Sequence, residues 1–174
     1  PRIDRELILE HHEGLIAILP SFGGEHVRAI KDGVEDRARE SVDWHKQLFG
    51  PDLYLEITRH HEVEGHEERM QKIIALGRGA EVALVAAHDT YYLKPDDAVA
   101  RELVNKIRIA SVLNRDSAEN VPDFSFITQE EARKLFADIP EALSNTLAIS
   151  ERCTLEIALG TAIFPDFPIP QGST

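Results

Sequence analysis

Short apolar runs alternate with amphipathic segments along the first two thirds of the chain. Apolar runs at 15–19, 53–57 and 82–87 have the length and the aliphatic content expected of buried strands. The run at 53–57 also alternates, so that its first, third and fifth residues would share one face of a sheet. Segments with helical spacing follow these runs, which predicts repeated strand–helix units.

Helices are predicted where apolar residues recur every three or four positions. They cover 3–13, a segment that includes Val27 and Ile30, and then 34–49, 66–77 and 98–113. Two glycines are expected to end the fourth of these helices, Gly77 and Gly79. The apolar residues of the fifth are expected to lie in the core: Val99, Leu103, Ile107 and Ile109.

The succession of strand–helix units predicts a parallel α/β fold with right-handed crossovers. Two arrangements fit this pattern, a doubly wound sheet and part of a barrel. In both, the residues that carry chemistry lie at the carboxyl ends of the strands. The polar residues that follow each predicted strand are therefore the first candidates for a functional site.

The last third of the chain has a different pattern. A polar loop and a short extended segment are expected over 114–127. Two helices follow, one that opens with a Thr-x-x-Glu capping box at 128–131 and a longer one at 140–153. The proline-punctuated segment at 164–172 predicts an extended connector to further chain.

The chain has 174 residues, enough for one domain with its own core, and 19 basic against 31 acidic residues give a net charge of −12. This balance gives no electrostatic case for direct binding of a phosphate backbone. Cys153 is the only cysteine, which excludes a disulfide framework and fits a reducing cytoplasm. No apolar run approaches the ~20 residues of a membrane span. Because Pro1 stands in place of an initiator methionine, the chain is expected to be an excised or processed piece.

Carboxylates and imidazoles stand at the ends of two predicted strands. Glu56 and His60 belong to the second strand and its exit, and His88 and Asp89 follow the third. Such a mixture suits a divalent metal such as zinc, manganese or iron. A metal of this kind lowers the pKa of bound water and supports phosphoester hydrolysis.

The spacing of these residues is weakly specific, and other interpretations stay open. Asp89 could brace its loop, Glu56 could form a salt bridge at the edge of the sheet, and His60 could be a surface histidine. Six further histidines have no strand-end position and are expected to be structural or solvated: His11, His12, His26, His45, His61 and His66.

A set of short segments carries a family resemblance: 1–4, 13–17, 23–25, Phe-Gly-Pro-Asp-Leu-Tyr-Leu-Glu-Ile at 49–57 with Arg59 and His60, 86–93, 140–143 with Asn145 and Thr146, Ile149 with 151–153, and 164–168. In this order they resemble the alpha subunit of bacterial DNA polymerase III. The resemblance covers nearly the whole chain, and its collinear matches make it more specific than any single motif. It points to the later part of the PHP (polymerase and histidinol phosphatase) domain of that subunit, without the opening His-x-His motif of the family.

The resemblance implies a distorted (β/α)7-type barrel, of which this chain would hold the later parallel strands and outer helices. Residues 1–160 would be the later portion of a PHP domain, and residues 161–174 a connector toward a polymerase palm that is not present here. Intact members hold a metal cluster at the barrel mouth, with phosphoesterase or proofreading-type activity. In other members the site has degenerated and the domain is structural.

The resemblance places Glu56 and His60 on the ligand positions of a Leu-Glu-Ile-x-x-His motif, and Asp89 on the aspartate of an Asp-x-His motif. Tyr91 replaces the histidine of the second motif. A neutral tyrosine is a poor metal ligand at pH 7, because its pKa is about 10. His88 stands where the family has asparagine and is a poor substitute, since adjacent strand positions point to opposite sides. We therefore expect no catalytic residue, no bound cofactor and no tightly held catalytic metal in this segment.

The resemblance further implies that the parent protein synthesises DNA on a template in the cytoplasm, with magnesium bound in its palm. This segment would stabilise that enzyme and contact the palm, the thumb or the proofreading exonuclease subunit. DNA would be held through other domains, and no membrane would be involved. Two alternatives stay open, a free-standing PHP-type metallophosphoesterase and a non-enzymatic interaction domain.

The edge of the sheet leads to one more expectation. Without the first strands of the barrel, the sheet would keep an open edge, which invites pairing with another copy. We therefore expect the isolated segment to dimerise or exchange strands at high concentration.

Overall fold

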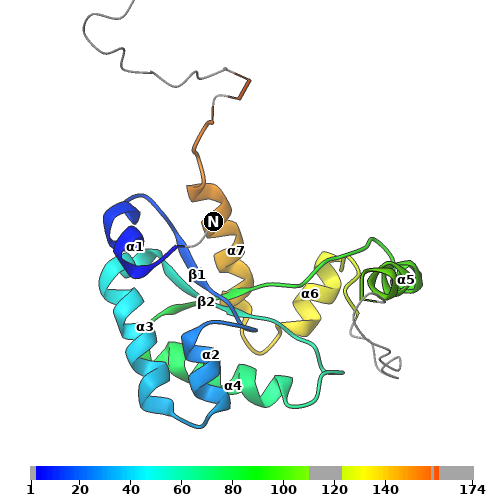
Figure 1. Ribbon diagram of the computed structural model, residues 1–174, viewed down its shortest axis with the longest axis horizontal. Helices are drawn as coiled ribbons and strands as arrows, with labels where there is room; N and C mark the ends of the chain where they lie inside the picture. Colours follow the sequence, from blue (N-terminus) through cyan, green and yellow to red (C-terminus); the bar gives the residue numbers. More distant parts are fainter. Residues whose placement is uncertain (1–2, 110–122, 158, 161–174) are drawn as a thin grey trace, which may run out of the picture.

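The computed structural model describes residues 3–109, 123–157 and 159–160, and Figure 1 shows how their helices and strands are arranged. Residues 110–122, which hold the end of the helix predicted at 98–113 and most of the polar loop predicted at 114–123, lie outside these ranges, as does the connector at 161–174. No helix of the described ranges is long and apolar enough to cross a membrane. The elements are α1 (Arg5–His11), β1 (Ala17–Leu19), α2 (Glu25–Lys31), α3 (Glu35–Phe49), the 3-10 turn η1 (Gly50–Asp52), β2 (Leu53–Ile57), α4 (His66–Ala80), β3 (Ala83–Ala86), the 3-10 turn η2 (Pro95–Asp97), α5 (Ala98–Ile109), α6 (Gln129–Leu135) and α7 (Pro140–Arg152).

The three strands form one parallel sheet in the order β1-β2-β3. Residues 17–19 lie opposite 53–55, and residues 54–57 lie opposite 83–86. The predicted parallel α/β fold is therefore confirmed, and the sheet with its helices is consistent with part of a PHP-type barrel. Because the strands run in the same direction, their carboxyl ends meet at one edge of the sheet.

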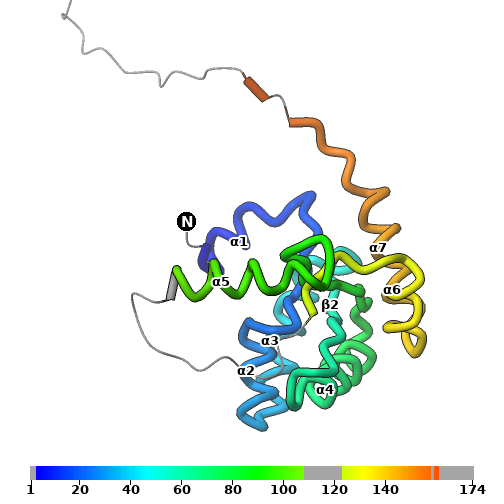
Figure 2. Tube along the Cα trace, turned by 90° about the vertical axis from the view of Figure 1, so that its right-hand side faces the viewer, coloured from blue at the N-terminus to red at the C-terminus, as the bar shows by residue number. Residues whose placement is uncertain are grey.

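Strand β2 lies at the centre of the core, because both of its edges are paired and both of its faces are covered. Leu53, Leu55 and Ile57 are fully buried, and Tyr54 on the opposite face is buried as well. Helices α3 and α4 pack on the sheet, α2 packs on α3 and α4, and α7 packs along β3. Figure 2 shows these helices from the side. Each large apolar side chain buried in this way contributes about 1.5–3 kcal/mol.

The capping box predicted at 128–131 is present at the start of α6. The Thr128 hydroxyl accepts from the backbone N–H of Glu131, and the Glu131 carboxylate accepts from the backbone N–H of Thr128. Helix α6 leads into residues that are buried in the same core as β2: Phe136, Ile139 and Ala142. The elements after residue 123 therefore complete the main core.

Helix α4 is longer than predicted. It continues through Gly77 and Gly79 and ends at Ala80, after which Glu81 takes the left-handed conformation that closes the helix. The reason is the close approach of α4 to the sheet. A Cβ at position 77 would lie 2.7 Å from Leu84 Cδ2 and 3.1 Å from Leu55 Cδ1. Gly77 is thus a packing residue, and the prediction that it ends the helix was wrong.

Helix α5 forms where it was predicted, but its expected core residues are not buried. Val99, Leu103 and Ile107 are exposed, and the side chain of Ile109 lies outside the described part of the chain. Helical spacing identified the apolar side of α5 correctly. It could not show that no other described element covers that side.

The two edges of the sheet differ. Along the outer edge of β3, helix α7 packs closely, and Asn145 Nδ2 donates to the carbonyl of Leu84 at 2.7 Å. Strand β1 is shorter than the predicted 15–19, and Leu15 and Ile18 are exposed rather than buried. Within the described residues, no strand pairs with the outer side of β1. An unpaired strand edge therefore exists at β1, whereas α7 covers that of β3.

The close packing at position 77 gives a first prediction. Gly77→Ala should lower the free energy of unfolding by about 1–3 kcal/mol, because the new methyl group overlaps Leu84. Gly79→Ala in the same helix is the matched control, since its Cβ would meet Arg39 at an ordinary 3.7 Å. The control should leave stability unchanged or raise it by up to about 1 kcal/mol. Urea unfolding of both variants measures this, and equal effects would contradict the packing role of Gly77.

Candidate functional site

Polar side chains from all three strand ends meet at the carboxyl edge of the sheet. Ser21 follows β1, Glu56 lies near the end of β2, and Asp89 follows β3. The Glu56 carboxylate accepts two hydrogen bonds through Oε1, from the backbone N–H of Ser21 at 2.9 Å and from its hydroxyl at 2.6 Å. One predicted ligand, Glu56, is therefore tied to the exit of the neighbouring strand.

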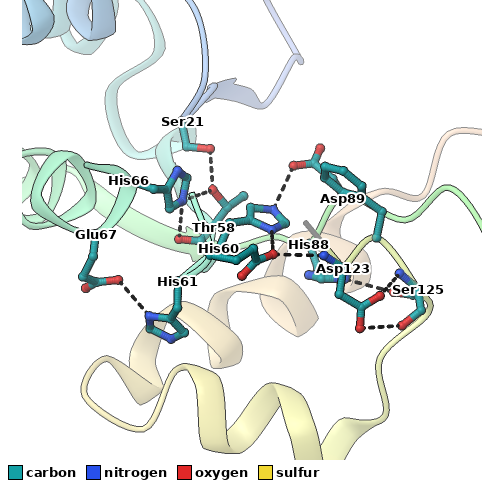
Figure 3. Close-up of polar contacts among 12 residues, drawn as sticks. Ser21, Thr58, His60, His61, His66, Glu67, His88, Asp89, Asp123 and Ser125 are labelled. Atoms are coloured by element: carbon teal, nitrogen blue, oxygen red, sulfur yellow. Dashed lines mark hydrogen bonds and ion pairs between the residues drawn. The ribbon is translucent and has the colours of Figure 1, made fainter. Parts of the chain in front are cut away.

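A chain of hydrogen bonds continues inward from Ser21, as Figure 3 shows. The Glu56 carboxylate can only accept hydrogen bonds, and this fixes which group donates in each of the following bonds. Because the Ser21 hydroxyl donates to Glu56, Ser21 Oγ accepts from Thr58 Oγ1 at 2.9 Å. Thr58 Oγ1 in turn accepts from His66 Nε2 at 3.1 Å. The imidazole of His66 is fully buried, and burial lowers the pKa of His66, although its bond to the Thr58 carbonyl opposes this shift.

The second predicted ligand, His60, contacts the third, Asp89. His60 Nε2 lies 3.3 Å from Asp89 Oδ2, and His60 Nδ1 lies 3.5 Å from a carboxylate oxygen of Glu62. The His60 side chain is buried, so the alternative of a surface histidine is wrong. Figure 3 shows His60 between the Ser21–Thr58–His66 chain and Asp89.

His88 is held by a different partner. Its ring stacks on that of His60, with centroids 5.6 Å apart and planes 27° apart. His88 Nε2 lies 2.9 Å from the carbonyl oxygen of Ser125 and must donate to it. The segment that contains Ser125 is extended, as predicted, and pairs with Tyr92 through an isolated parallel bridge. His88 therefore connects β3 to this later segment.

Tyr91 lies in an aromatic contact. Its ring meets Phe124 edge-on at 5.1 Å, and the Arg101 guanidinium lies 3.8 Å from the Tyr91 ring centre and 4.6 Å from that of Phe124. The side chain that the sequence resemblance puts in place of a ligand histidine is thus engaged with α5 and with the 124–127 segment.

The predicted ligands do not form one metal-binding group. Within the described residues, no three His, Cys, Asp or Glu side chains are arranged so that they could hold a metal ion. Glu56 is hydrogen-bonded to Ser21, whereas His60 and Asp89 are hydrogen-bonded to each other. The residues present therefore do not fit the metal cluster that the family resemblance implies.

The structure adds a buried charge that the sequence did not single out. The Arg59 side chain is only 2% exposed and forms ion pairs with Glu67 at 2.5 Å and with Asp138 at 2.6 Å. These pairs connect the end of β2 to the start of α4 and to the turn between α6 and α7. Arg59 comes shortly after a predicted strand, which could have made it a candidate. The neighbouring sequence, however, does not indicate that its partner Asp138 lies 79 residues away. The hydrogen-bonding roles of Ser21, Thr58 and His66 were missed for the same reason.

Comparison with known proteins first defines the class. Residues 1–60 match the family model of the PHP domain. The chain is also similar to proteins named DNA polymerase III subunit alpha. It is 34% identical to that of Borreliella burgdorferi and 33% identical to that of Pseudomonas aeruginosa, in each case over 98% of this chain and 15% of the relative.

A further relative, the DNA polymerase III subunit alpha of Helicobacter pylori, is 34% identical over 91% of this chain and 14% of its own length. The chain therefore spans only about 15% of the length of the relatives it matches. These matches confirm the resemblance predicted from the sequence. The chain is related, over nearly all of its length, to bacterial DNA polymerase III alpha subunits, and its first 60 residues match the PHP domain.

The ion pairs of Arg59 give a second prediction. The double variant Glu67→Gln, Asp138→Asn leaves a buried, unpaired guanidinium and should lower the free energy of unfolding by about 3 kcal/mol or more. Adding Arg59→Met to it should restore part of the loss, because the uncompensated charge is removed. Glu130→Gln, which breaks the exposed pair with Lys134, is the control and should cost less than about 1 kcal/mol. Urea unfolding tests this, and no recovery in the triple variant would contradict it.

The buried imidazole of His66 gives a third prediction, on pH dependence. Because the pKa of His66 is lowered on folding, the unfolded chain binds a proton that the folded chain does not as the pH falls below about 6.5. Stability should therefore be complete above that pH and decrease below it. His66→Gln should flatten this decrease, whereas His11→Gln at an exposed position should not. Unfolding curves from pH 8 to pH 5 measure the slope, and identical slopes in all three proteins would contradict the assignment.

Proposed function

We propose that this chain is a segment of a bacterial DNA polymerase III alpha subunit, the cytoplasmic enzyme that carries out template-directed DNA synthesis in replication. The observation that carries the proposal is similarity over 98% of the chain to relatives that are several times longer. Synthesis itself is assigned to a palm domain with bound magnesium, outside these 174 residues. Within them, residues 1–160 are the later portion of a PHP domain and residues 161–174 lead toward the palm.

The role proposed for this segment is structural. Each family ligand position is already engaged within the chain: Glu56 by Ser21, and His60 and Asp89 by each other. Tyr91 packs on Phe124. These contacts support a degenerate metal site whose polar groups hold strand ends together. No catalytic step is assigned to it.

The partners of the segment follow from the same proposal. The remainder of the alpha subunit, with its palm and thumb, is the main one, the proofreading exonuclease subunit is a second, and DNA is contacted through other domains. In isolation, two copies are proposed to associate through the unpaired outer side of β1, where Ile18 is exposed. The net charge of −12 opposes this association and confines it to high concentration.

A free-standing PHP-type metallophosphoesterase is the rival proposal, because the PHP family model matches residues 1–60. It requires the gene product to end near Thr174 and to hydrolyse phosphoesters. The natural full-length gene product decides between the two in a primer-extension assay. Extension of a primed template supports the polymerase, whereas phosphoester hydrolysis without extension supports the rival.

The degenerate site gives a fourth prediction. Titration of the chain with Zn²⁺ and with Mn²⁺ in a calorimeter should show no stoichiometric tight binding, because Glu56 is bonded to Ser21 and lies outside the His60–Asp89 pair. Tyr91→His is the informative variant, since it restores the side chain of the family motif. One tightly bound metal per chain, lost in Glu56→Gln and in Asp89→Asn, together with turnover of p-nitrophenyl phosphate, would contradict the proposal.

A further inference from the structure

The apolar side of helix α5 faces away from the other described parts of the molecule. Val99, Leu103 and Ile107, spaced four residues apart, are 74%, 60% and 70% exposed, and Val104 beside them is exposed as well. Such spacing places them along one side of the helix. We call these four residues the α5 stripe. Figure 1 shows α5 end-on and apart from the layer formed by α2, α3 and α4.

The opposite side of α5 is turned toward the molecule, although it is the more polar one. The half-buried positions of the helix are Ala98, Arg101, Glu102 and Asn105, which recur at the i, i+3, i+4 and i+7 spacing of one helical face. Arg101 fixes this orientation through its contacts with Tyr91 and Phe124. An amphipathic helix whose polar side faces inward leaves its apolar side for another partner.

The charges on the molecule discriminate among partners. The net charge of −12 on each chain opposes the pairing of two copies through the stripe at low concentration. An anionic membrane surface would need free cations beside the stripe. Lys106 pairs with Glu102 at 2.9 Å, and Arg101 lies over two aromatic rings, so the two α5 cations whose side chains the structure describes are engaged within the chain.

The length of the relatives points to a partner in the same polypeptide. This chain corresponds to about 15% of each of them, so a longer chain of this kind would hold many further surfaces at high effective concentration. Docking of an amphipathic helix uses anchors spaced three or four residues apart in an apolar groove. The α5 stripe has this spacing.

We propose that the α5 stripe docks into an apolar groove formed by a part of the longer polypeptide outside residues 1–174. This inference rests on the proposed function, since it requires a chain longer than this segment. The groove would bury Val99, Leu103 and Ile107 as anchors and leave the contact of Arg101 with Tyr91 unchanged. The apolar residues of α5 that the sequence pattern predicted to be buried would then be buried, in a core that residues outside this segment complete.

Cysteine accessibility tests the proposal directly. Cys153 is the only cysteine and is exposed, so a Cys153→Ser background removes it. Leu103→Cys is then compared in the 174-residue chain and in the natural full-length gene product, with any other cysteines of that product replaced. Maleimide labelling of the thiol introduced by Leu103→Cys should be at least tenfold slower in the longer protein. Lys134→Cys, at a position whose side chain is 73% exposed on α6, should react at similar rates in both.

Other outcomes overturn the proposal. Equally fast labelling of the Leu103→Cys variant in both proteins would show that nothing covers the stripe, and equally slow labelling would show that the 174-residue chain covers it itself. Protection in the 174-residue chain that rises with its concentration would indicate a second copy, and protection only with phosphatidylserine vesicles would indicate a membrane. A natural gene product that ends at Thr174 would overturn it as well. Ile107→Cys is the second variant in case Leu103→Cys does not fold.

Primer extension and thiol labelling, both measured on the full-length Leu103→Cys protein, test the proposed function and the docking of α5 separately. Primer extension by a Leu103→Cys protein whose introduced thiol reacts freely would refute the α5 docking alone. A protected thiol in a Leu103→Cys protein that extends no primer would refute the polymerase assignment and leave the docking in place.

Discussion

Parallel pairing of β2 with a strand on each side is the constraint on which the rest of this structure depends. It brings the ends of three strands to one edge, so that Ser21, Glu56 and Asp89 come from distant parts of the sequence to neighbouring positions. It also buries four of the five residues of β2, all except Glu56, and Arg59 and His60 just after the strand are buried as well. Buried charges and imidazoles need partners. Glu67 and Asp138 pair with Arg59, and Asp89 contacts Nε2 of His60, whereas Nδ1 of His60 and Nδ1 of His66 have no hydrogen-bond partner among the described residues.

The polar contacts at the strand ends join side chains of this chain to one another. The bonds from His66 through Thr58 and Ser21 to Glu56 tie the start of α4 to β2 and to the exit of β1. Arg59 extends the same arrangement to Asp138 in the turn before α7. A catalytic metal site requires carboxylates and imidazoles that converge on one point with free lone pairs. Here His60 and Asp89 contact each other, whereas Glu56 is hydrogen-bonded to Ser21.

Much of the fold could be predicted from local pattern, because short apolar runs and helical spacing are local properties. The parallel sheet, the Thr128 capping box and the positions of Glu56, His60 and Asp89 at strand ends were all accessible in this way. The hydrogen bond between Ser21 and Glu56 and the ion pair between Arg59 and Asp138 were not, since they join residues 35 and 79 positions apart. Gly77 shows the same limit, because its meaning depends on Leu84 across the core.

Helix α5 shows most clearly that a local sequence pattern predicts a helix but not which of its residues are buried. Its apolar positions follow helical spacing, yet Leu103 is exposed, because no other described residue covers this side. Tyr91 is a comparable case. The sequence shows that it is not histidine, but only the structure shows that its ring is engaged by Arg101 and Phe124.

Glu56 is hydrogen-bonded to Ser21, and we propose that it does not serve as a metal ligand. A double-mutant cycle of Ser21→Ala and Glu56→Gln, followed by urea unfolding in the presence of Zn²⁺, measures the coupling between these two side chains. The account predicts a coupling free energy of about 1.5–3 kcal/mol, as for a hydrogen bond to a charged group, and no stabilisation by Zn²⁺. A coupling indistinguishable from zero, with Zn²⁺ stabilising the protein only when Glu56 is intact, would contradict it.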